Sequence, residues 1–238
     1  MQKGKTSAGK KQSPEDAAFA GLQIHIPAIR IKLLRWYDRN SRKYPWRKTG
    51  NWFHLLMAEM MLRRTKADQV LPVYKIFTEQ FKTPSEAASL PAADFKKMMH
   101  PLGLSWRSLQ MQETINYLKD NYSKRQPEKS DNLKNIPGVG DYANAMLRNK
   151  LFNERCAAVD SNVVRFLSRL AGIAYHPENR RKYFIKTAAD SLMNSKRSFD
   201  LNLAILDYTA LVCKIKKPLC LKCSFKKLCR YGGSGYQI

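Results

Sequence analysis

Four of the five cysteines lie close together near the end of the chain, with six, two and five residues between them: Cys213, Cys220, Cys223 and Cys229. Thiolates at this spacing are ligands for a soft metal, either zinc or an iron–sulfur cluster, and the spacing alone leaves both open. Four unpaired thiols are the alternative, and they would be prone to oxidation. Because lysines stand between these cysteines, Arg230 follows the last one and no acid lies among them, we expect a metal-shaped loop that binds phosphates. The fifth cysteine, Cys156, stands alone, which favours a small buried residue.

A glycine-rich segment, residues 136–142, separates two stretches with helical periodicity. Pro137 fixes one turn torsion, while Gly138 and Gly140 permit positive φ and a close approach of the backbone. Free N–H groups around Val139, at the start of the next helix, would then bind a phosphate. The alternative is an ordinary turn between two helices.

Asp160 lies twenty positions after Gly140, immediately before another helical stretch. Its ordinary role there is to cap the helix N-terminus. A carboxylate at such a place also stays ionised, because the helix dipole favours an anion. A fixed anion of this kind is suited to face a sugar that becomes cationic.

Glu59 lies in a helical stretch, residues 52–64, surrounded by the apolar residues Leu55, Leu56, Met57, Met60 and Met61. Burial among such neighbours would raise the pKa of its carboxyl group and keep it protonated, as a general acid requires. The alternative is an exposed glutamate on the outer face of an amphipathic helix.

The composition indicates a polyanionic partner. The chain has 238 residues, of which 44% are hydrophobic, and a formal charge of +24. Nucleic acid is the expected partner, and an anionic membrane surface or a merely solvated basic face are the alternatives. No apolar run is long enough to span a bilayer, and the lysine-rich N-terminus lacks the apolar core of a secretory signal. We therefore expect no membrane association and a location in the reducing cytoplasm or nucleoid.

Helical periodicity without an alternating strand pattern predicts an all-α fold. The N-terminal residues are polar and rich in lysine, so we expect residues 1–26 to form a basic, disordered arm. A flexible tail is expected over residues 232–238. The predicted helical stretches are residues 29–40, 52–64, 67–81, 105–122, 142–152, 162–170, 181–193 and 201–212.

The glycine-rich hairpin, Asp160 and the cysteine spacing together resemble the endonuclease III superfamily of helix-hairpin-helix DNA glycosylases, over about residues 29–230. The resemblance implies a six-helix domain with the hairpin, residues 49–154, and a discontinuous cluster domain, residues 27–48 and 155–231. It implies a [4Fe–4S] cluster rather than zinc on the four cysteines. It also implies a monomer that binds mismatched double-stranded DNA and flips the substrate base into the cleft between the domains.

Two further segments, Tyr44–Arg47 and Glu59–Thr65, resemble the branch shared by the adenine glycosylases (MutY) and the mismatch-specific thymine glycosylases (MIG). The Leu-Arg-Arg-Thr sequence resembles MIG, since adenine glycosylases usually have two glutamines at Arg63 and Arg64. Ser161 departs from both groups, because MutY usually has glycine at this position and MIG is expected to have alanine. The chain ends at Ile238, without the 8-oxoguanine recognition domain usual in MutY, which also favours MIG.

The resemblance assigns catalytic roles to three residues. Asp160 would stabilise the oxocarbenium-like sugar or attack C1′, and Glu59 would protonate the departing base. Tyr142 stands where endonuclease III has the lysine that forms a Schiff base, so we expect a monofunctional enzyme that leaves an abasic site. The alternative role for Tyr142 is packing of the helix behind the hairpin.

Three neighbouring residues are candidates for contact with DNA. Leu62 would enter the space left by the flipped base. Arg63 and Arg64 would donate hydrogen bonds to the orphan guanine, or else simply contact phosphates.

The expected activity is hydrolysis of the N-glycosidic bond of thymine or uracil opposite guanine, in base excision repair. The nearest alternative is an adenine glycosylase acting on A:8-oxoguanine or A:G pairs. An oxidised-pyrimidine glycosylase is disfavoured by the missing lysine. An alternative of another class is a non-catalytic DNA-binding module stapled by a metal.

Overall fold

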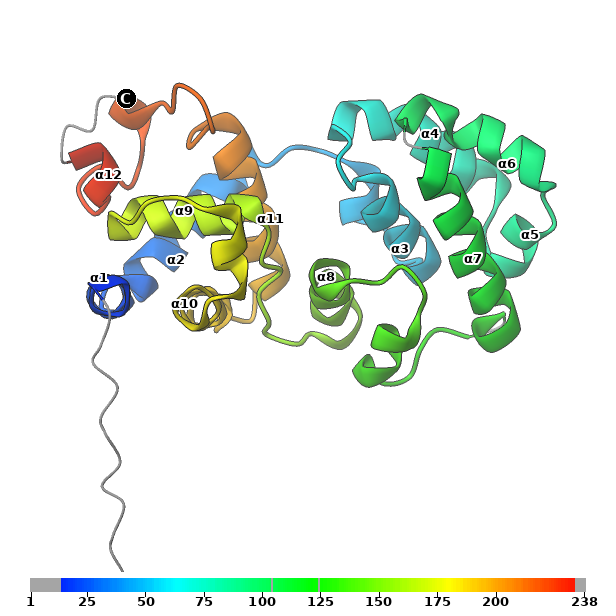
Figure 1. The fold of residues 1–238 in the computed structure, drawn as a ribbon, viewed down its shortest axis with the longest axis horizontal. Coiled ribbons are helices and arrows are strands. Elements are labelled where there is room, and N and C mark those ends of the chain that lie inside the picture. The colour runs from blue at the N-terminus through cyan, green and yellow to red at the C-terminus, as the bar shows by residue number, and fades with distance from the viewer. Residues whose placement is uncertain (1–13, 104, 124, 234–238) are drawn as a thin grey trace, which may run out of the picture. The chain divides into compact units, whose positions relative to one another are not determined.

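The computed structural model describes residues 14–103, 105–123 and 125–233. This part of the chain consists of helices and connecting loops and contains no strand (Figure 1). The predicted all-α class is therefore confirmed.

The longer helices follow the predicted periodicity with small shifts at their ends. In chain order the α-helices are α1 (Pro14–Gln23), α2 (Ile26–Asn40), α3 (Trp52–Met61), α4 (Ala67–Gln80), α5 (Pro84–Ala88), α6 (Ala92–Met99), α7 (Ser105–Tyr122), α8 (Asp141–Phe152), α9 (Ser161–Ala171), α10 (Tyr183–Met193), α11 (Ser198–Leu211) and α12 (Arg230–Gly233). Short 3₁₀ turns are η1 (Pro45–Arg47), η2 (His100–Leu102), η3 (Ser130–Asn135), η4 (Pro177–Arg181) and η5 (Cys220–Lys222).

The helices group into two compact units, and each unit combines separate stretches of sequence. Unit 1 comprises Met1–Tyr37, Val159–Leu192 and Ala204–Ile238, and unit 2 comprises Asp38–Ala158 and Met193–Leu203. This grouping differs from the expected division, which placed residues 38–48, 155–158 and 193–203 with the cysteine loop. These residues belong to unit 2, where Asn202 Oδ1 accepts a hydrogen bond from the Ala158 backbone at 2.9 Å.

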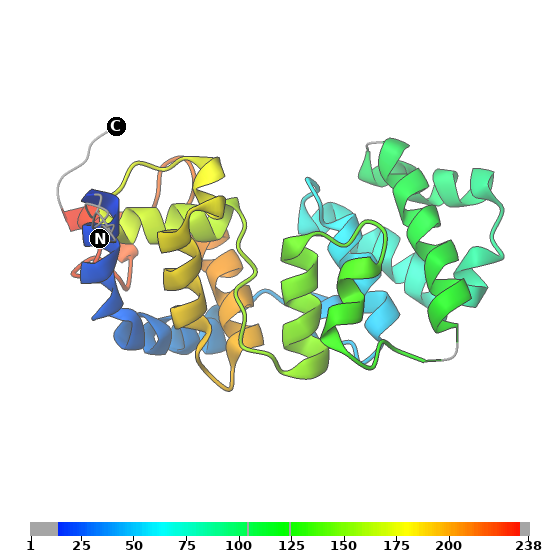
Figure 2. The ribbon, with the colours of Figure 1, turned by 60° about the horizontal axis from the view of Figure 1, so that its bottom comes forward.

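Helix α3 is the centre of unit 2. Its N-cap Asn51 accepts hydrogen bonds from the backbones of Phe53 and His54, which starts the helix where the apolar run begins. Every residue from Phe53 to Met61 is buried. Each fully buried large apolar side chain contributes about 1.5–3 kcal/mol, so this helix is firmly held. Helices α4 and α8 pack against it, and α5 and α6 pack against α7 (Figure 2).

Helix α9 is the centre of unit 1, and its residues from Val163 to Ala171 are all buried. Its Phe166 ring packs edge-on against Tyr208 and Phe225, at centroid distances of 6.0 and 5.4 Å. Tyr208 lies on α11 and Phe225 in the cysteine loop, so this aromatic cluster joins α9 to the segment that holds the four cysteines.

The prediction of a disordered arm over residues 1–26 is wrong from Pro14 onward. Pro14 begins α1, and acidic residues in its first turn favour a helix start there. Phe19 and Leu22 are buried, and Phe19 stacks on Phe184 at 4.8 Å. Two apolar residues one turn apart were enough to order this segment. Residues 1–13 lie outside the described residues, as do residues 234–238 of the predicted tail, whose first residues end α12.

None of the described helices alone has the length and apolar composition needed to cross a membrane. Helices α1 and α2, which meet at 64°, pass that test only as a bent pair.

Candidate active site

Asp160 is fixed at the N-terminus of α9. Its Oδ1 atom accepts hydrogen bonds from the backbone nitrogens of Asn162 and Val163, each at 2.9 Å. The side-chain amide of Asn162 donates to Oδ2 at 2.6 Å. The capping role is therefore present, and these hydrogen bonds fix the orientation of the carboxylate.

Burial raises the pKa of Asp160 above its usual range, while the hydrogen bonds from Val163 and Asn162 and the charge of Arg165 act in the opposite direction. This direction is opposite to the one expected from the helix dipole, which favours the anion. Removing a carboxylate from water disfavours its charged form, and here that effect exceeds the stabilisation by its donors.

A chain of hydrogen bonds runs from Asp160 to the backbone of the cysteine loop. Asn162, which donates to Asp160, accepts a hydrogen bond from Nη2 of Arg165 at 3.0 Å through its Oδ1 atom. Nε of Arg165 donates to the carbonyl oxygen of Cys213 at 3.3 Å. Only 4% of Arg165 is exposed, so its position is fixed by the core of unit 1. The orientation of the carboxylate is thus linked to the start of the cysteine loop.

A second buried arginine of α9, Arg169, holds the same loop. Its guanidinium donates to the carbonyl oxygens of Lys214 and Ile215 at 2.7 and 3.1 Å. It also lies 3.4 Å from Sγ of Cys213. Hydrogen bonds from one guanidinium to consecutive carbonyls fix the backbone of the loop rather than one side chain.

Tyr208 contacts the loop from α11. Its hydroxyl donates to Sγ of Cys223 at 3.2 Å and accepts a hydrogen bond from the backbone of Ser224 at 2.9 Å. Burial and the hydrogen bond to Cys223 raise the pKa of Tyr208, so the hydroxyl remains a donor at neutral pH.

The four loop cysteines are half-buried free thiols. Burial raises the pKa of Cys213 and Cys229, and the nearby thiol of Cys223 raises both further. Among the described residues, however, no three His, Cys, Asp or Glu side chains are gathered in the geometry of a metal site.

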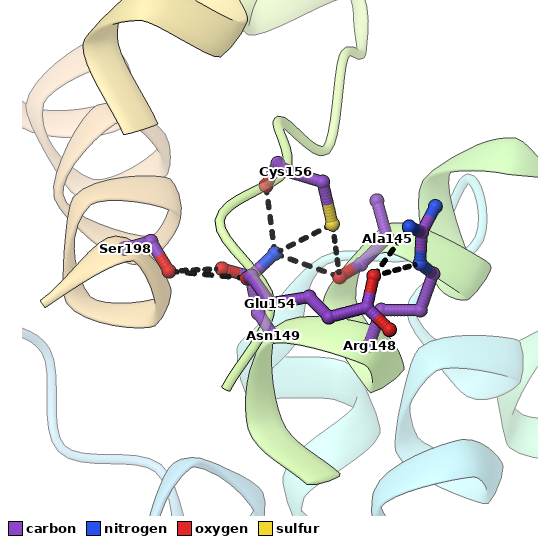
Figure 3. Close-up of polar contacts among 6 residues, drawn as sticks. All are labelled: Ala145, Arg148, Asn149, Glu154, Cys156 and Ser198. Atoms are coloured by element: carbon purple, nitrogen blue, oxygen red, sulfur yellow. Dashed lines mark hydrogen bonds and ion pairs between the residues drawn. The ribbon is translucent and has the colours of Figure 1, made fainter. Parts of the chain in front are cut away.

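Cys156 lies in unit 2 and belongs to a separate set of contacts (Figure 3). It is half-buried rather than fully buried, and the side-chain amide of Asn149 donates to its carbonyl oxygen at 2.7 Å. Ser198 donates to Oδ1 of Asn149 at 2.5 Å, and Arg148 pairs with Glu154. These bonds hold the segment after α8 against α11 within unit 2.

The glycine-rich hairpin depends on one of its two glycines. Gly138 has a φ of 78°, and a Cβ there would lie 3.0 Å from Cε of Met60 and 3.1 Å from Oγ1 of Thr114. Gly140 has an extended backbone and open space around it, so it does not use the positive φ that a glycine permits. The amide of Val139 donates to the carbonyl of Ile136 at 3.0 Å. It closes the turn and is not free for a phosphate, contrary to expectation.

Helix α8 begins directly after the hairpin, at Asp141, and no side chain caps its N-terminus. The amides of its first turn therefore have no intrahelical acceptor. Tyr142 lies in this first turn and is half-buried. Helix α8 packs against α3, the helix that carries Glu59.

Glu59 is buried, with 6% of its surface exposed, among the apolar residues of α3. Burial lowers the pKa of the neighbouring Arg63 below its usual range, and Glu59 acts in the opposite direction. The exposed alternative is therefore excluded for this glutamate. A carboxyl group in such surroundings has the setting of a proton donor.

Helix α3 ends at Met61, three residues earlier than the apolar pattern indicated, and residues 62–64 form a turn that we call the wedge turn. Leu62 packs partly against the core of unit 2. Arg64 is exposed and has a φ of 56°, a left-handed conformation that is unusual for a residue with a side chain. Arg63 instead donates from Nη1 to Oε1 of Gln110 at 3.0 Å and from Nη2 to the carbonyl of Gly138.

Sequence reasoning missed the α7 residues behind the wedge turn. Arg107, Gln110 and Thr114 lie in a stretch that reads as an ordinary amphipathic helix. The available signal was an arginine on the face that also carries Met111 and Ile115, which are buried.

No family model matches the chain. Among curated proteins, it is 31% identical over 218 residues to the thymine/uracil-DNA glycosylase of Methanothermobacter thermautotrophicus, covering 91% of this chain and 97% of the relative. It is 28% identical over 215 residues to the thymine-DNA glycosylase of Aeropyrum pernix, covering 87% and 95%. The adenine DNA glycosylase of Rattus norvegicus is 27% identical, but only 42% of its length is covered.

Solved structures agree with these relatives. A thermostable thymine-DNA glycosylase superimposes with a TM-score of 0.81 and 29% identity, over 90% of this chain and 99% of that one. A non-covalent endonuclease III–DNA complex has the same fold, with a TM-score of 0.74 and 21% identity, over 89% and 97%. The fold, hairpin and cysteine loop define a helix-hairpin-helix DNA glycosylase. Within that class, the chain belongs to the family of the thymine/uracil-DNA glycosylases.

Proposed function

We propose that this protein is a monofunctional glycosylase that removes thymine or uracil mispaired with guanine, as a step in base excision repair. The observation that carries the proposal is the carboxylate of Asp160, fixed by three hydrogen bonds at the start of α9. The names of the archaeal relatives supply the substrate class, and the +24 charge supports DNA as the partner.

In this proposal the protein binds as a monomer to one strand of a duplex that contains the mismatch. The cysteine loop contributes lysines, and the first turn of α8 contributes amides for phosphates. Leu62 would fill the space left by the flipped base. A wobble mismatch opens at a lower cost than a good pair, which favours the target over normal DNA.

The chemical step breaks the bond between C1′ and the base nitrogen, and the bonding electrons leave with the base. Asp160 stabilises the positive charge that develops on the sugar, or attacks C1′. Glu59 gives a proton to the departing pyrimidine, directly or through water. Water then adds to C1′ and loses a proton, and the products are the free base and an abasic strand.

Tyr142 supports the assignment as a monofunctional enzyme, because a phenol cannot form a Schiff base with the sugar. It would hydrogen-bond near the sugar or its phosphate. Replacing it in the variant Tyr142→Lys is expected to introduce strand cleavage, since a lysine amine can attack C1′. Borohydride would then trap a covalent protein–DNA adduct with the variant and none with the wild type. Tyr142→Phe is the control, and trapping by the wild type would contradict the assignment.

We further propose that Cys213, Cys220, Cys223 and Cys229 hold a [4Fe–4S] cluster. Their fit rests on the donor set, four soft sulfurs on a short basic loop, three of which influence one another electrostatically. When bound, the cluster would supply cross-links that rigidify the loop, since hydrolysis needs no electron transfer. Arg169 and Tyr208 would hold the loop around it from α9 and α11.

A cluster would be visible during purification. Protein prepared without oxygen is expected to be brown and to contain about four irons and four inorganic sulfides per chain. Cys220→Ser should lower the iron content and weaken DNA binding, while Cys156→Ser should leave both unchanged. Colourless protein with one zinc per chain would contradict the cluster and favour a zinc site.

The substrate assignment is tested with a panel of duplexes that contain G:T, G:U, A:8-oxoguanine or A:G pairs, each treated with alkali after reaction. We expect strand breaks at the T and U of the first two duplexes only. Cleavage at the adenine would favour the adenine glycosylases, which also match this chain. Binding to an abasic-site analogue without base release from any duplex would leave only a non-catalytic DNA-binding module.

A further inference from the structure

Helix α7 carries three polar side chains on one face, at positions 107, 110 and 114, a spacing that places them on successive turns. One of them, Arg107, contacts the two residues that flank the wedge turn. Its Nη1 atom donates to the carbonyl of Met61 at 3.0 Å and to Oγ1 of Thr65 at 2.6 Å. A single guanidinium therefore bridges the backbone before the wedge turn and the side chain after it.

The setting of Arg107 is costly for the fold. Only 2% of the residue is exposed, and within the described residues its Nε and Nη2 atoms have no hydrogen-bond partner. The nearby Arg63 and Arg64 repel its charge. A buried cation with unsatisfied donors is destabilising, so its presence points to a role that outweighs that cost.

The other two residues reach the hairpin. Gln110 accepts a hydrogen bond from Arg63, which also donates to the carbonyl of Gly138. The hydroxyl of Thr114 lies 2.8 Å from the carbonyl of Pro137 and the same distance from that of Gln110, and shares its hydrogen between them. A Cβ at Gly138 would lie 3.0–3.3 Å from side-chain atoms of Met60, Gln110 and Thr114, which is tighter than an ordinary contact. The hairpin thus rests directly on α7 and on the end of α3.

We propose that Arg63, Arg107, Gln110 and Thr114 form a brace that fixes the wedge turn to the hairpin. The proposal rests on the proposed function, in which the first turn of α8, directly after the hairpin, binds phosphate and Leu62 fills the space left by the flipped base. The brace holds the wedge turn and the hairpin as one rigid body. Leu62 would then enter the duplex at a fixed distance from the bound phosphate. A loose wedge would have to be ordered during base opening, at an entropic cost to that step.

The brace changes the role of one residue. The hydrogen bonds of Arg63 to Gln110 and Gly138 make it a positioning residue rather than a reader of the orphan guanine. Arg64, exposed and held in the left-handed conformation, is the arginine that faces outward to DNA.

Thr114 provides the sharpest test, because it is fully buried and cannot touch DNA. Thr114→Val keeps the size of the side chain and removes the hydroxyl, while Thr114→Ser retains the hydroxyl. Single-turnover rates are measured on uracil opposite guanine and on uracil opposite an abasic site, where no partner base resists opening. We expect Thr114→Val to slow the first reaction about 10-fold or more and the second by at most about 2-fold, and Thr114→Ser to resemble the wild type.

Arg63→Met should reproduce this pattern, and Arg125→Met, which removes an exposed arginine of unit 2, should change neither rate. A loss with Arg63→Met but none with Thr114→Val would make Arg63 a guanine reader and overturn the brace. Equal losses on both duplexes would also overturn it.

Amide hydrogen exchange tests the brace proposal independently of the proposed function. Thr114→Val and Arg63→Met are expected to speed amide exchange at residues 62–65 and to leave α4 unchanged. Unchanged exchange there would reject the brace even if the wild type proved inactive. A wild type inactive on every uracil duplex would reject the proposed function alone.

Discussion

Replacing Asp160 with asparagine is expected to slow base release by about 10²–10³-fold, the cost of removing one well-placed electrostatic group from a buried site. The negative charge is lost while the shape of the side chain is kept. Asparagine is also a good N-cap, so its Oδ1 atom can still accept from the backbones of Asn162 and Val163. Only the hydrogen bond from the side-chain amide of Asn162 is lost, because the new NH2 group replaces its acceptor, Oδ2. Helix α9 should therefore begin as before, and the loss would report on chemistry rather than folding.

Single-turnover base release and DNA affinity are measured side by side for this variant. DNA binding should stay within a few-fold of wild type, and Asp190→Asn, which changes an exposed aspartate of α10, should be fully active. Because burial raises the pKa of Asp160, the wild-type rate should begin to fall with acid at a higher pH than an exposed aspartate would give. Undiminished turnover by Asp160→Asn would reject its catalytic role.

Replacing Glu59 with glutamine is expected to slow release of uracil by about 10²-fold or more, the usual contribution of a general acid. Glutamine fills the same space among the buried residues of α3, so packing should be preserved. The readout specific to proton donation is the leaving group. The more acidic 5-fluorouracil needs less protonation, so the variant should lose much less activity on it than on uracil.

An equal loss on uracil and 5-fluorouracil would mean that Glu59 positions the substrate instead of protonating it. Glu79→Gln, at an exposed position of α4, is the matched control and should behave as wild type. Thermal unfolding of both variants would show whether the buried substitution alters stability.

Several features of the site followed from local sequence. The apolar run around Glu59 predicted its burial, because a helix hydrophobic on all sides must lie in a core. Asp160 before a helical stretch predicted the cap, and the Pro-Gly pair predicted the positive φ of Gly138. Each of these depends on neighbours within one or two turns, which a sequence displays directly.

Features that depend on residues far apart in the chain could not be predicted from the local sequence. The bond between Arg63 and Gly138 joins residues 75 positions apart, and the contact of Arg165 with Cys213 spans 48 positions. Helix α1 was missed for the same reason, because Phe184, far along the chain, buries its apolar face. No local pattern reveals which of several arginines will find an acceptor in the fold and which will remain exposed.

The central claim is that this protein breaks one bond, between a pyrimidine and its sugar, and leaves the strand intact. Mass spectrometry of the products from a G:U and a G:T duplex tests it directly, without alkali. The account predicts free uracil or thymine together with a full-length strand that has gained water in place of the base. A duplex recovered unchanged, or a strand already cut beside the missing base, would contradict it.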